Sequence, residues 1–193
     1  GWYNKETGKP DIELTCTDEM SGCHSIHWVF GDEKDKEEFH EEVLGDGSDS
    51  MTIPTDDIPE GTSTLRYYSR DNAQDKENIR NTEEISSTTI KVDTIAPEVE
   101  EYSLNGDSED VFFDPDKNDS GVEIELTASE AVDWTSVKIQ NIDNNSIYRI
   151  FYPSEVNSTT SVTWTGDISS DESLKDGKYE VVYNIKDVAG NQT

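Results

Sequence analysis

Residues 103–121, SLNGDSEDVFFDPDKNDSG, hold six acidic side chains and two asparagines within nineteen positions. Carboxylate and amide oxygens are the ligands that Ca²⁺ prefers, and the ion takes roughly six to eight of them. Asp107 and Asp110 could join Asp114 or Asp116 around one Ca²⁺. The competing interpretation is a solvated acidic loop without an ion, and the residue types alone do not choose between the two.

The spacing in this stretch does not fit a regular EF-hand loop. Asp114, Asp116 and Asn118 fit the first, third and fifth positions of such a loop, and Glu125 fits the last. The sixth position should be Gly and is Asp119. Glu125 also belongs to an alternating strand pattern and should point away from the core. A bound ion would therefore lie in a looser cage of oxygens.

A second candidate ion-binding stretch holds Asp71, Asn72 and Asp75.

The carboxylates of this chain offer little sign of catalysis. Catalysis by paired carboxylates needs two groups in different environments, one of them withdrawn from water. The loops supply many carboxylates but no apolar segment that would form such a pocket. The sequence also has no HExxH, GxSxG or P-loop pattern. We expect no enzymatic activity.

Two cysteines, Cys16 and Cys23, lie in TCTDEMSGCHSIHW. One interpretation is a disulfide, which would imply an oxidising compartment. The other is a metal site formed with His24 and His27. Structural zinc sites usually place their cysteines about two to four residues apart, closer than here. The spacing favours the disulfide, with Asp18 capping the turn between the cysteines.

The second half of the chain contains four Asn-x-Ser/Thr sequences, which are acceptors for N-glycosylation in organisms that modify exported proteins. Their asparagines are Asn118, Asn144, Asn157 and Asn191. The alternative is unmodified asparagine in turns.

The composition is strongly acidic and poor in apolar residues. Residues 1–97 carry 23 acidic and 9 basic side chains, net −14, and residues 98–193 carry 21 and 6, net −15, which sum to −29. Nucleic acids and anionic membrane surfaces would be repelled. High salt, bound divalent cations or neighbouring molecules could each offset the self-repulsion. Only 31% of the residues are hydrophobic, so any core must be thin.

The chain has no stretch of the roughly 20 apolar residues that spans a membrane. It starts at Gly1-Trp2-Tyr3 without Met and without a signal-peptide apolar region. We expect it to be a piece of a longer, exported protein, located outside the cell at the cell surface.

Alternating apolar and polar residues predict strands along the first half. Ile12, Leu14 and Cys16 share one face of DIELTCT, and Leu65 and Tyr67 share one face of STLRYYSRD. SIHWVF, SMTIPT and STTIKVD predict three further strands. EKDKEEFHEEV fits either one or two helical turns or a charged loop.

The second half shows the same period of two. GVEIELTASE, TSVKIQNID, NSIYRIFY, TSVTWTGD and GKYEVVYNIKD predict strands at intervals of about ten residues, which is typical of a sandwich. TSVKIQNID and NSIYRIFY should form a hairpin around DNN. KVDTIAPEVEEY predicts a short joint, because Pro97 restricts the residue before it. The sequence thus predicts an all-β protein of two tandem Ig-like β-sandwich domains, residues 1–96 and 97–193.

The motifs of the first half resemble bacterial and archaeal extracellular Ig-like repeats. The matching sequences are GWYNK, IELTCTDEMSGCHSIHWVF, MTIPTDDIPEGTSTLRYYSRDNAQDKE and the joint VDTIAP. The family ends its repeats in Asp-Asn-Ala-Gly-Asn, where this chain has Gln74 and Asp75 at the last two positions.

The second half resembles a flagellar hook-capping-type Ig-like repeat. The matching sequences are LNGDSEDVF, VKIQNID, WTGD, LKDGKYEV and KDVAGNQ. Such repeats serve as stalks, lattice modules and spacers. The resemblance implies a structural module pair of a prokaryotic cell-surface protein of the S-layer or stalk type. Its partners would be neighbouring domains, copies of the same protein and cations.

The alternative function is an adhesive or carbohydrate-binding module of an adhesin or secreted hydrolase. Tyr148, Phe151 and Tyr152 in YRIFYPSEV could stack on sugar rings. Aromatic residues in a strand are more often part of the core.

Overall fold

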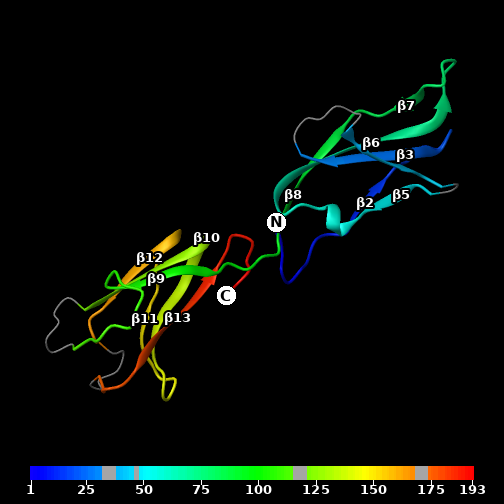
Figure 1. Cartoon of the computed structure of the whole chain (residues 1–193). Helices are drawn as coiled ribbons and strands as arrows, with labels where there is room; N and C mark the ends of the chain where they lie inside the picture. The colour runs from blue at the N-terminus through cyan, green and yellow to red at the C-terminus, as the bar shows by residue number, and fades with distance from the viewer. Residues whose placement is uncertain (32–37, 46–47, 115–120, 168–173) are drawn as a thin grey trace. The chain divides into compact units, whose positions relative to one another are not determined.

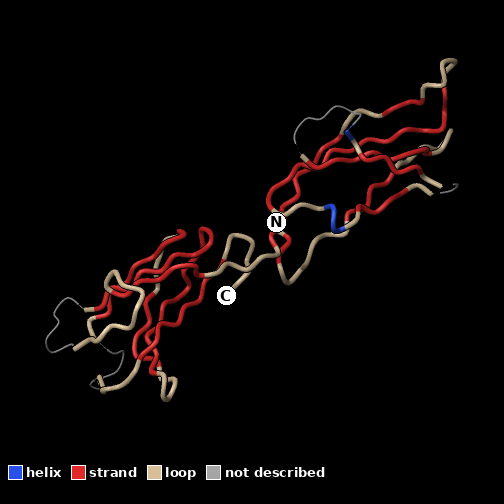
Figure 2. Tube along the Cα trace, viewed as in Figure 1, coloured by secondary structure: helices blue, strands red, loops and turns tan. Residues whose placement is uncertain are grey.

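The computed structural model describes residues 1–31, 38–45, 48–114, 121–167 and 174–193 (Figure 1). The chain separates into two compact units, Gly1–Thr94 and Ile95–Thr193, two residues before the predicted boundary. The described residues contain strands, turns and short 3-10 segments but no α-helix (Figure 2). The prediction of an all-β protein with two sandwich-like domains is confirmed.

The first unit has two sheets, and Figure 1 shows β3, β6 and β8 in one layer with β2 and β5 in the other. The larger sheet has the order β1-β8-β6-β3-β4, with β7 paired to β6, and β2 pairs with β5. The strands are β1 (Tyr3–Asn4), β2 (Ile12–Thr15), β3 (Cys23–Phe30), β4 (His40–Val43), β5 (Ser50–Ile53), β6 (Gly61–Gln74), β7 (Arg80–Thr82) and β8 (Ser86–Asp93), with a 3-10 turn η2 (Thr55–Asp57) after β5.

The core of the first unit forms where the alternating faces of the two sheets meet. Leu14 of β2 and Ile53 of β5 pack with Ile26 and Trp28 of β3 and with Leu65 of β6. All five side chains are buried. Of the predicted inward residues, Leu14, Cys16 and Leu65 are buried, and Ile12 and Tyr67 are partly buried against the same core, as the period of two predicts.

A strand replaces the helical alternative in the segment between β3 and β5. His40–Val43 form β4, which pairs antiparallel with β3. The helical alternative is wrong for these residues, because backbone pairing with β3 requires an extended chain. Residues 32–37 of the same segment lie outside the described residues. Phe39 is buried, in a small cluster with Val29 and Tyr68.

The second unit is organised by one long strand. Its strands are β9 (Val99–Leu104), β10 (Val122–Asn141), β11 (Ile147–Phe151), β12 (Val156–Trp164) and β13 (Tyr179–Lys186). The first part of β10 pairs with β9 and β12, and the last part pairs with β11 and β13. The register shifts between Thr127 and Val132. The two strands predicted in GVEIELTASE and TSVKIQNID are thus two parts of one bent strand.

The core of the second unit surrounds Trp134, whose side chain is 0% exposed. The inward positions predicted along β10 are Val122, Ile124, Leu126 and Ala128, and all are buried. Alternate residues of β13 pack against the same core, as predicted: Tyr179, Val181, Tyr183 and Ile185. The hairpin of β10 and β11 is also present.

Gly121, directly before β10, occupies a position that a side chain cannot enter. Its φ is +75°, and a Cβ there would lie 2.6 Å from the carbonyl oxygen of Trp164. That oxygen belongs to β12, the partner of β10, so it cannot move without breaking the sheet.

We predict that Gly121→Ala destabilises the protein far more than Gly106→Ala. Gly106 has φ +82°, but nothing lies within 4 Å of an added Cβ. Both variants suffer the left-handed backbone penalty of about 1–2 kcal/mol, and only Gly121→Ala adds the clash. Urea unfolding followed by circular dichroism would measure both. Equal losses in the two variants would contradict this account.

Candidate functional sites

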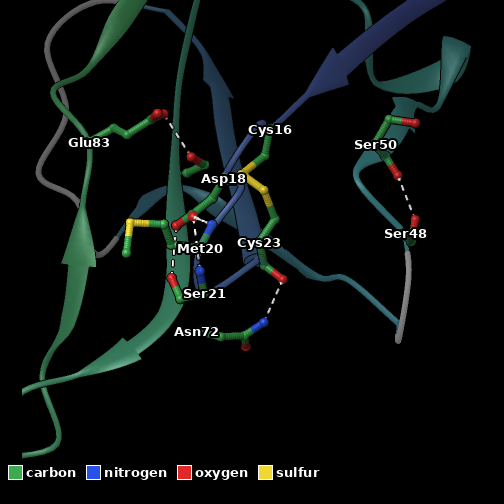
Figure 3. Close-up of a disulfide and its surroundings, with 10 residues drawn as sticks. Cys16, Asp18, Met20, Ser21, Cys23, Ser48, Ser50, Asn72 and Glu83 are labelled. Atoms are coloured by element: carbon green, nitrogen blue, oxygen red, sulfur yellow. Dashed lines mark hydrogen bonds between the residues drawn. A yellow bond between two sulfur atoms is a disulfide. The ribbon is translucent and has the colours of Figure 1, made fainter.

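The turn between β2 and β3 is closed by a disulfide between Cys16 and Cys23, as predicted (Figure 3). Their Cα atoms lie 6.1 Å apart, and both side chains are buried against the core of the first unit. The alternative metal site is excluded in this state, because both sulfur atoms are bonded to each other. The side chain of His27 is also buried on β3, away from solvent.

Asp18 caps this turn, as predicted, and is drawn in Figure 3. Its Oδ1 accepts the backbone N–H of Met20 at 2.8 Å and that of Ser21 at 3.0 Å, and its Oδ2 accepts the hydroxyl of Ser21 at 2.8 Å. The N–H of Met20 and then the Ser21 hydroxyl hold the pKa of the Asp18 carboxyl below its usual value of 3.8. This carboxylate therefore stabilises a turn by accepting hydrogen bonds.

The second predicted ion-binding stretch has structural hydrogen bonds of its own. Asn72 donates from Nδ2 to the carbonyl of Cys23 at 3.0 Å. Asp71 accepts from the amide of Asn81 at 2.9 Å. Asp75 accepts the backbone N–H groups of Glu77 and Ile79 with one oxygen, at 2.8 and 2.9 Å, in the hairpin between β6 and β7. Ion binding by this stretch stays a prediction.

A polar cluster on the outer face of the larger sheet superficially matches a hydrolytic triad. Ser25 Oγ lies 3.0 Å from His27 Nε2, and Glu41 Oε1 lies 3.4 Å from the same nitrogen. A triad needs the acid on Nδ1, so that the imidazole can take the serine proton at Nε2. Here both groups contact Nε2, and the side chain of Ser25 is 0% exposed. This cluster cannot present a nucleophile to a substrate.

Aromatic stacking holds the same cluster together. The ring of His27 stacks on that of Tyr68 with centroids 4.4 Å apart, and Phe39 meets Tyr68 edge-on. The guanidinium of Arg70 lies over the Tyr68 ring. Burial raises the pKa of the Tyr68 hydroxyl, and the charge of Arg70 lowers it by a smaller amount. The cluster is a second, smaller core with polar edges.

The acidic stretch that opens the second unit begins with a tight turn. Leu104 and Asp107 exchange backbone hydrogen bonds of 2.6 and 3.1 Å. Asp107 and Asp110 are exposed, Asp114 is half-buried, and Asp116 lies outside the described residues. The predicted Ca²⁺ site at these four residues therefore stays a prediction.

Apolar residues between these acids are divided between core and solvent. Val111 and Phe113 pack against the core of the second unit, whereas Phe112 is fully exposed. The stretch is thus attached to the sandwich at two points and is more than a solvated linker.

The structure brings two other acidic side chains together in the second unit. Carboxylate oxygens of Glu130 and Asp187 lie within 4.8 Å of one another, with Glu130 half-buried and Asp187 buried. Glu130 lies where β10 bends, and Asp187 directly follows β13. Two carboxylates at this separation could supply some of the ligands of a metal ion. Sequence reasoning missed the pair because 57 positions separate the two residues (187 − 130).

Asp187 also organises the loop after β13. Its Oδ1 accepts the backbone N–H groups of Gly190 and Asn191 at 2.7 and 2.9 Å, and its Oδ2 accepts the Asn191 amide at 2.7 Å. That amide also lies 3.2 Å from the carbonyl of Ile95 at the start of the unit. The loop thereby joins the end of the unit to its beginning. This loop lies in KDVAGNQ, one of the sequences that carry the resemblance of the second half.

Only some of the four glycosylation candidates are accessible. Asn191 is buried at 4% exposure and uses its amide in the loop just described. Modification of Asn191 therefore conflicts with the folded structure. Asn144 and Asn157 are exposed, and Asn118 lies outside the described residues. Glycosylation at those three stays a prediction.

The predicted sugar-stacking residues do not share one exposed face. Phe151 packs against the core, and Tyr148 is half-buried with its ring edge-on to Tyr179. Tyr152 is 72% exposed. Two of the three rings therefore stabilise the sandwich.

Comparison with protein families assigns part of this architecture. Residues 108–187 match the FlgD Ig-like domain. The match runs from the acidic stretch through β10 to β13 and ends at Asp187. The predicted resemblance of the second half is supported, whereas that of the first half, which is β-rich, has no such support. Comparison with curated proteins gave no match. In the described residues, no helix is long and apolar enough to cross a membrane.

The loop after β13 has a glycine at a position where a similar sequence in the first unit has a glutamine. The second unit has Asp187-Val188-Ala189-Gly190-Asn191, in which Gly190 adopts φ +100°. A similar sequence in the first unit is Asp71 to Asp75, with Gln74 at the position of the glycine. Residues through Gln74 stay extended in β6 and continue into a hairpin with β7. A positive φ is costly for Gln, so the chain does not close the same loop there.

We predict that Gly190→Ala lowers the free energy of unfolding by about 1–2 kcal/mol, because Ala is strained at this φ. Urea unfolding would measure the loss, with Val188→Ala in the same loop as the control, since Val188 is 69% exposed. An unchanged stability in Gly190→Ala would contradict the role assigned to this loop.

We predict that Asp18→Ala destabilises the protein near neutral pH but not in strong acid. The folded pKa of Asp18 is depressed, so its contribution is present above the unfolded value of about 3.8 and is lost as the pH falls through the folded pKa. The urea midpoints of wild type and variant should therefore converge in acid. Glu19→Ala is the control. A difference between wild type and Asp18→Ala that does not change with pH would contradict this account.

Proposed function

We propose that this chain is a structural module pair of a prokaryotic cell-surface protein of the S-layer or stalk type, without enzymatic activity. The observation that carries the proposal is the match of residues 108–187 to the FlgD Ig-like domain, in a chain whose first unit is a second all-β unit with its own core. Modules of this kind set the spacing between other parts of a surface protein.

The chemistry of the first unit supports a location outside the cell. The disulfide between Cys16 and Cys23 closes a turn that Asp18 and Asn72 also hold. Disulfides persist in oxidising environments and are rare in reducing ones. The disulfide can therefore stabilise this turn in an exported protein, whereas it would be reduced inside the cell.

Cations are the proposed partners of the acidic surface. The whole chain has a net charge of −29. Repulsion among the carboxylates therefore destabilises both units. Divalent cations, Ca²⁺ in particular, would reduce this repulsion within the chain or between neighbouring copies. The pair of Glu130 and Asp187 is a candidate ligand set, as is the predicted set at Asp107, Asp110, Asp114 and Asp116.

An adhesive or carbohydrate-binding role is the alternative, and the described aromatic residues favour it less. Tyr152 is exposed, but Tyr148 and Phe151 contribute to packing. A sugar-binding face would need several exposed rings side by side.

We predict that Ca²⁺ raises the thermal midpoint of unfolding after treatment with EDTA. A ligand that binds only the folded state stabilises it by mass action. Mg²⁺, and NaCl at matched ionic strength, should raise the midpoint less. An equal response to NaCl would show that the salts only screen charge, and no response to any salt would remove cations from the proposal.

Two variants would locate the ion if the Ca²⁺ response is found. Glu130→Gln should abolish the response if the ion binds beside Asp187, and Asp110→Asn should abolish it if the ion binds in the acidic stretch. Glu155→Gln, an exposed acid in the same unit, is the matched control. A response that survives both variants would contradict both candidate ligand sets.

A further inference from the structure

The free edge of β4 in the first unit has the geometry of a strand-docking site. In the described part of the chain, β4 pairs with β3 and lies at one end of the larger sheet. The backbone N–H of Leu44 donates to the carbonyl of His24, across to the β3 side. In an antiparallel pair, successive residues direct their backbone groups alternately toward and away from the partner strand. The N–H and C=O groups of Glu41 and Val43 therefore point outward from the sheet.

A groove lies along this edge, between β4 and β5. Its volume is about 500 Å³, and its walls include Trp28, His40, Glu42, Met51 and Asp57. The ring of His40 stacks on Trp28 with centroids 4.6 Å apart, which fixes the inner face of β4. A second hollow of about 360 Å³ shares Val43 and Leu44 with the first and adds Asp49. Alternate side chains of an added strand would point into this groove.

The charge of the groove selects the kind of partner. Glu42 and Asp57 line the larger hollow, and Asp49 lines the smaller one. Glu41 also lines the larger hollow, but its carboxylate lies 4.0 Å from the guanidinium of Arg70, so that it contributes less to the charge of the groove. Among the described residues that line either hollow there is no lysine or arginine. Without bridging cations, a second copy of this chain would be repelled from this groove, because it brings the same net charge of −29. The complementary occupant is a cationic strand.

We propose that the β4 edge binds an extended, cationic segment of another protein by strand addition. The segment pairs its backbone with Glu41 and Val43 and carries lysine or arginine at alternate positions. Those side chains enter the groove beside Glu42 and Asp57. Backbone hydrogen bonds supply affinity in this mode of recognition, and the groove supplies the preference for sequence.

The test uses the whole chain and a synthetic peptide, acetyl-KTKTKTKT-amide, as the probe. Heteronuclear NMR titration should show saturable shifts of the β4 amides, and the amide protons of Glu41 and Val43 should become protected from exchange. Two control peptides carry glutamate in place of lysine, or proline within the strand. Equal binding of the proline peptide, or shifts spread evenly over the acidic surface, would overturn strand addition.

A proline variant isolates the backbone contribution. Val43→Pro removes an N–H that points outward, and proline is tolerated on the solvent side of an edge strand. Val43→Thr keeps that N–H and is the matched control. We expect Val43→Pro to weaken peptide binding at least about tenfold relative to Val43→Thr, with the same thermal midpoint.

Each outcome of this comparison decides the proposal. Equal affinities of the two variants would show that the peptide is held by charge alone and would overturn the proposal, as would failure of the wild-type chain to bind the lysine peptide. If Val43→Pro proves unstable, Glu42→Thr serves as the second variant. Glu42→Thr keeps the backbone N–H groups and removes one carboxylate from the groove. It should therefore lower the affinity for the lysine peptide without changing the hydrogen-exchange rate of the Val43 amide in the free protein. An unchanged affinity of Glu42→Thr would also overturn the proposal.

Discussion

The alternation of inward and outward side chains is the constraint on which the main core of each unit depends. With only 31% hydrophobic residues, the chain forms these cores by placing most apolar side chains of a strand on one face. β10 shows this along its first part, where Val122, Ile124 and Leu126 are buried and the intervening Glu123 and Glu125 are exposed. Acidic side chains then occupy the outward positions, where water solvates them.

Because the cores are thin, the ends of the strands need other means of closure. In the first unit a disulfide and the Asp18 cap close the turn between β2 and β3. In the second unit Asp187 accepts three N–H donors and holds the last loop to the first residues of the unit through Asn191. Several aspartates of this acidic chain therefore act as hydrogen-bond acceptors in turns. An acidic loop is not an ion site on the strength of its composition alone.

The larger sheet of the first unit is also buried in part on its second face. Tyr68 stacks on His27 there and Phe39 packs against Tyr68, so the sheet has a main core on one side and a polar-edged cluster on the other. This arrangement keeps the Ser25 and His27 side chains out of water. Among the strand ends of the described residues, the edge of β4 combines outward backbone groups with an acidic groove.

The sequence by itself predicted most of the strands and many of their inward faces, and it favoured the disulfide and the turn at Asp18, because these depend on neighbours within a few positions. Period-two alternation states which side chains share a face, and the short spacing of Cys16 and Cys23 places them at one turn. Only the tertiary structure decided that two predicted strands are one bent β10, that Glu130 lies beside Asp187, and that Asn191 is buried. These features depend on which distant strands pair. No local sequence pattern predicts a contact between residues that are far apart in the chain. The helical alternative for His40–Val43 failed for the same reason, since pairing with β3 outweighed the local helical spacing of Phe39 and Val43.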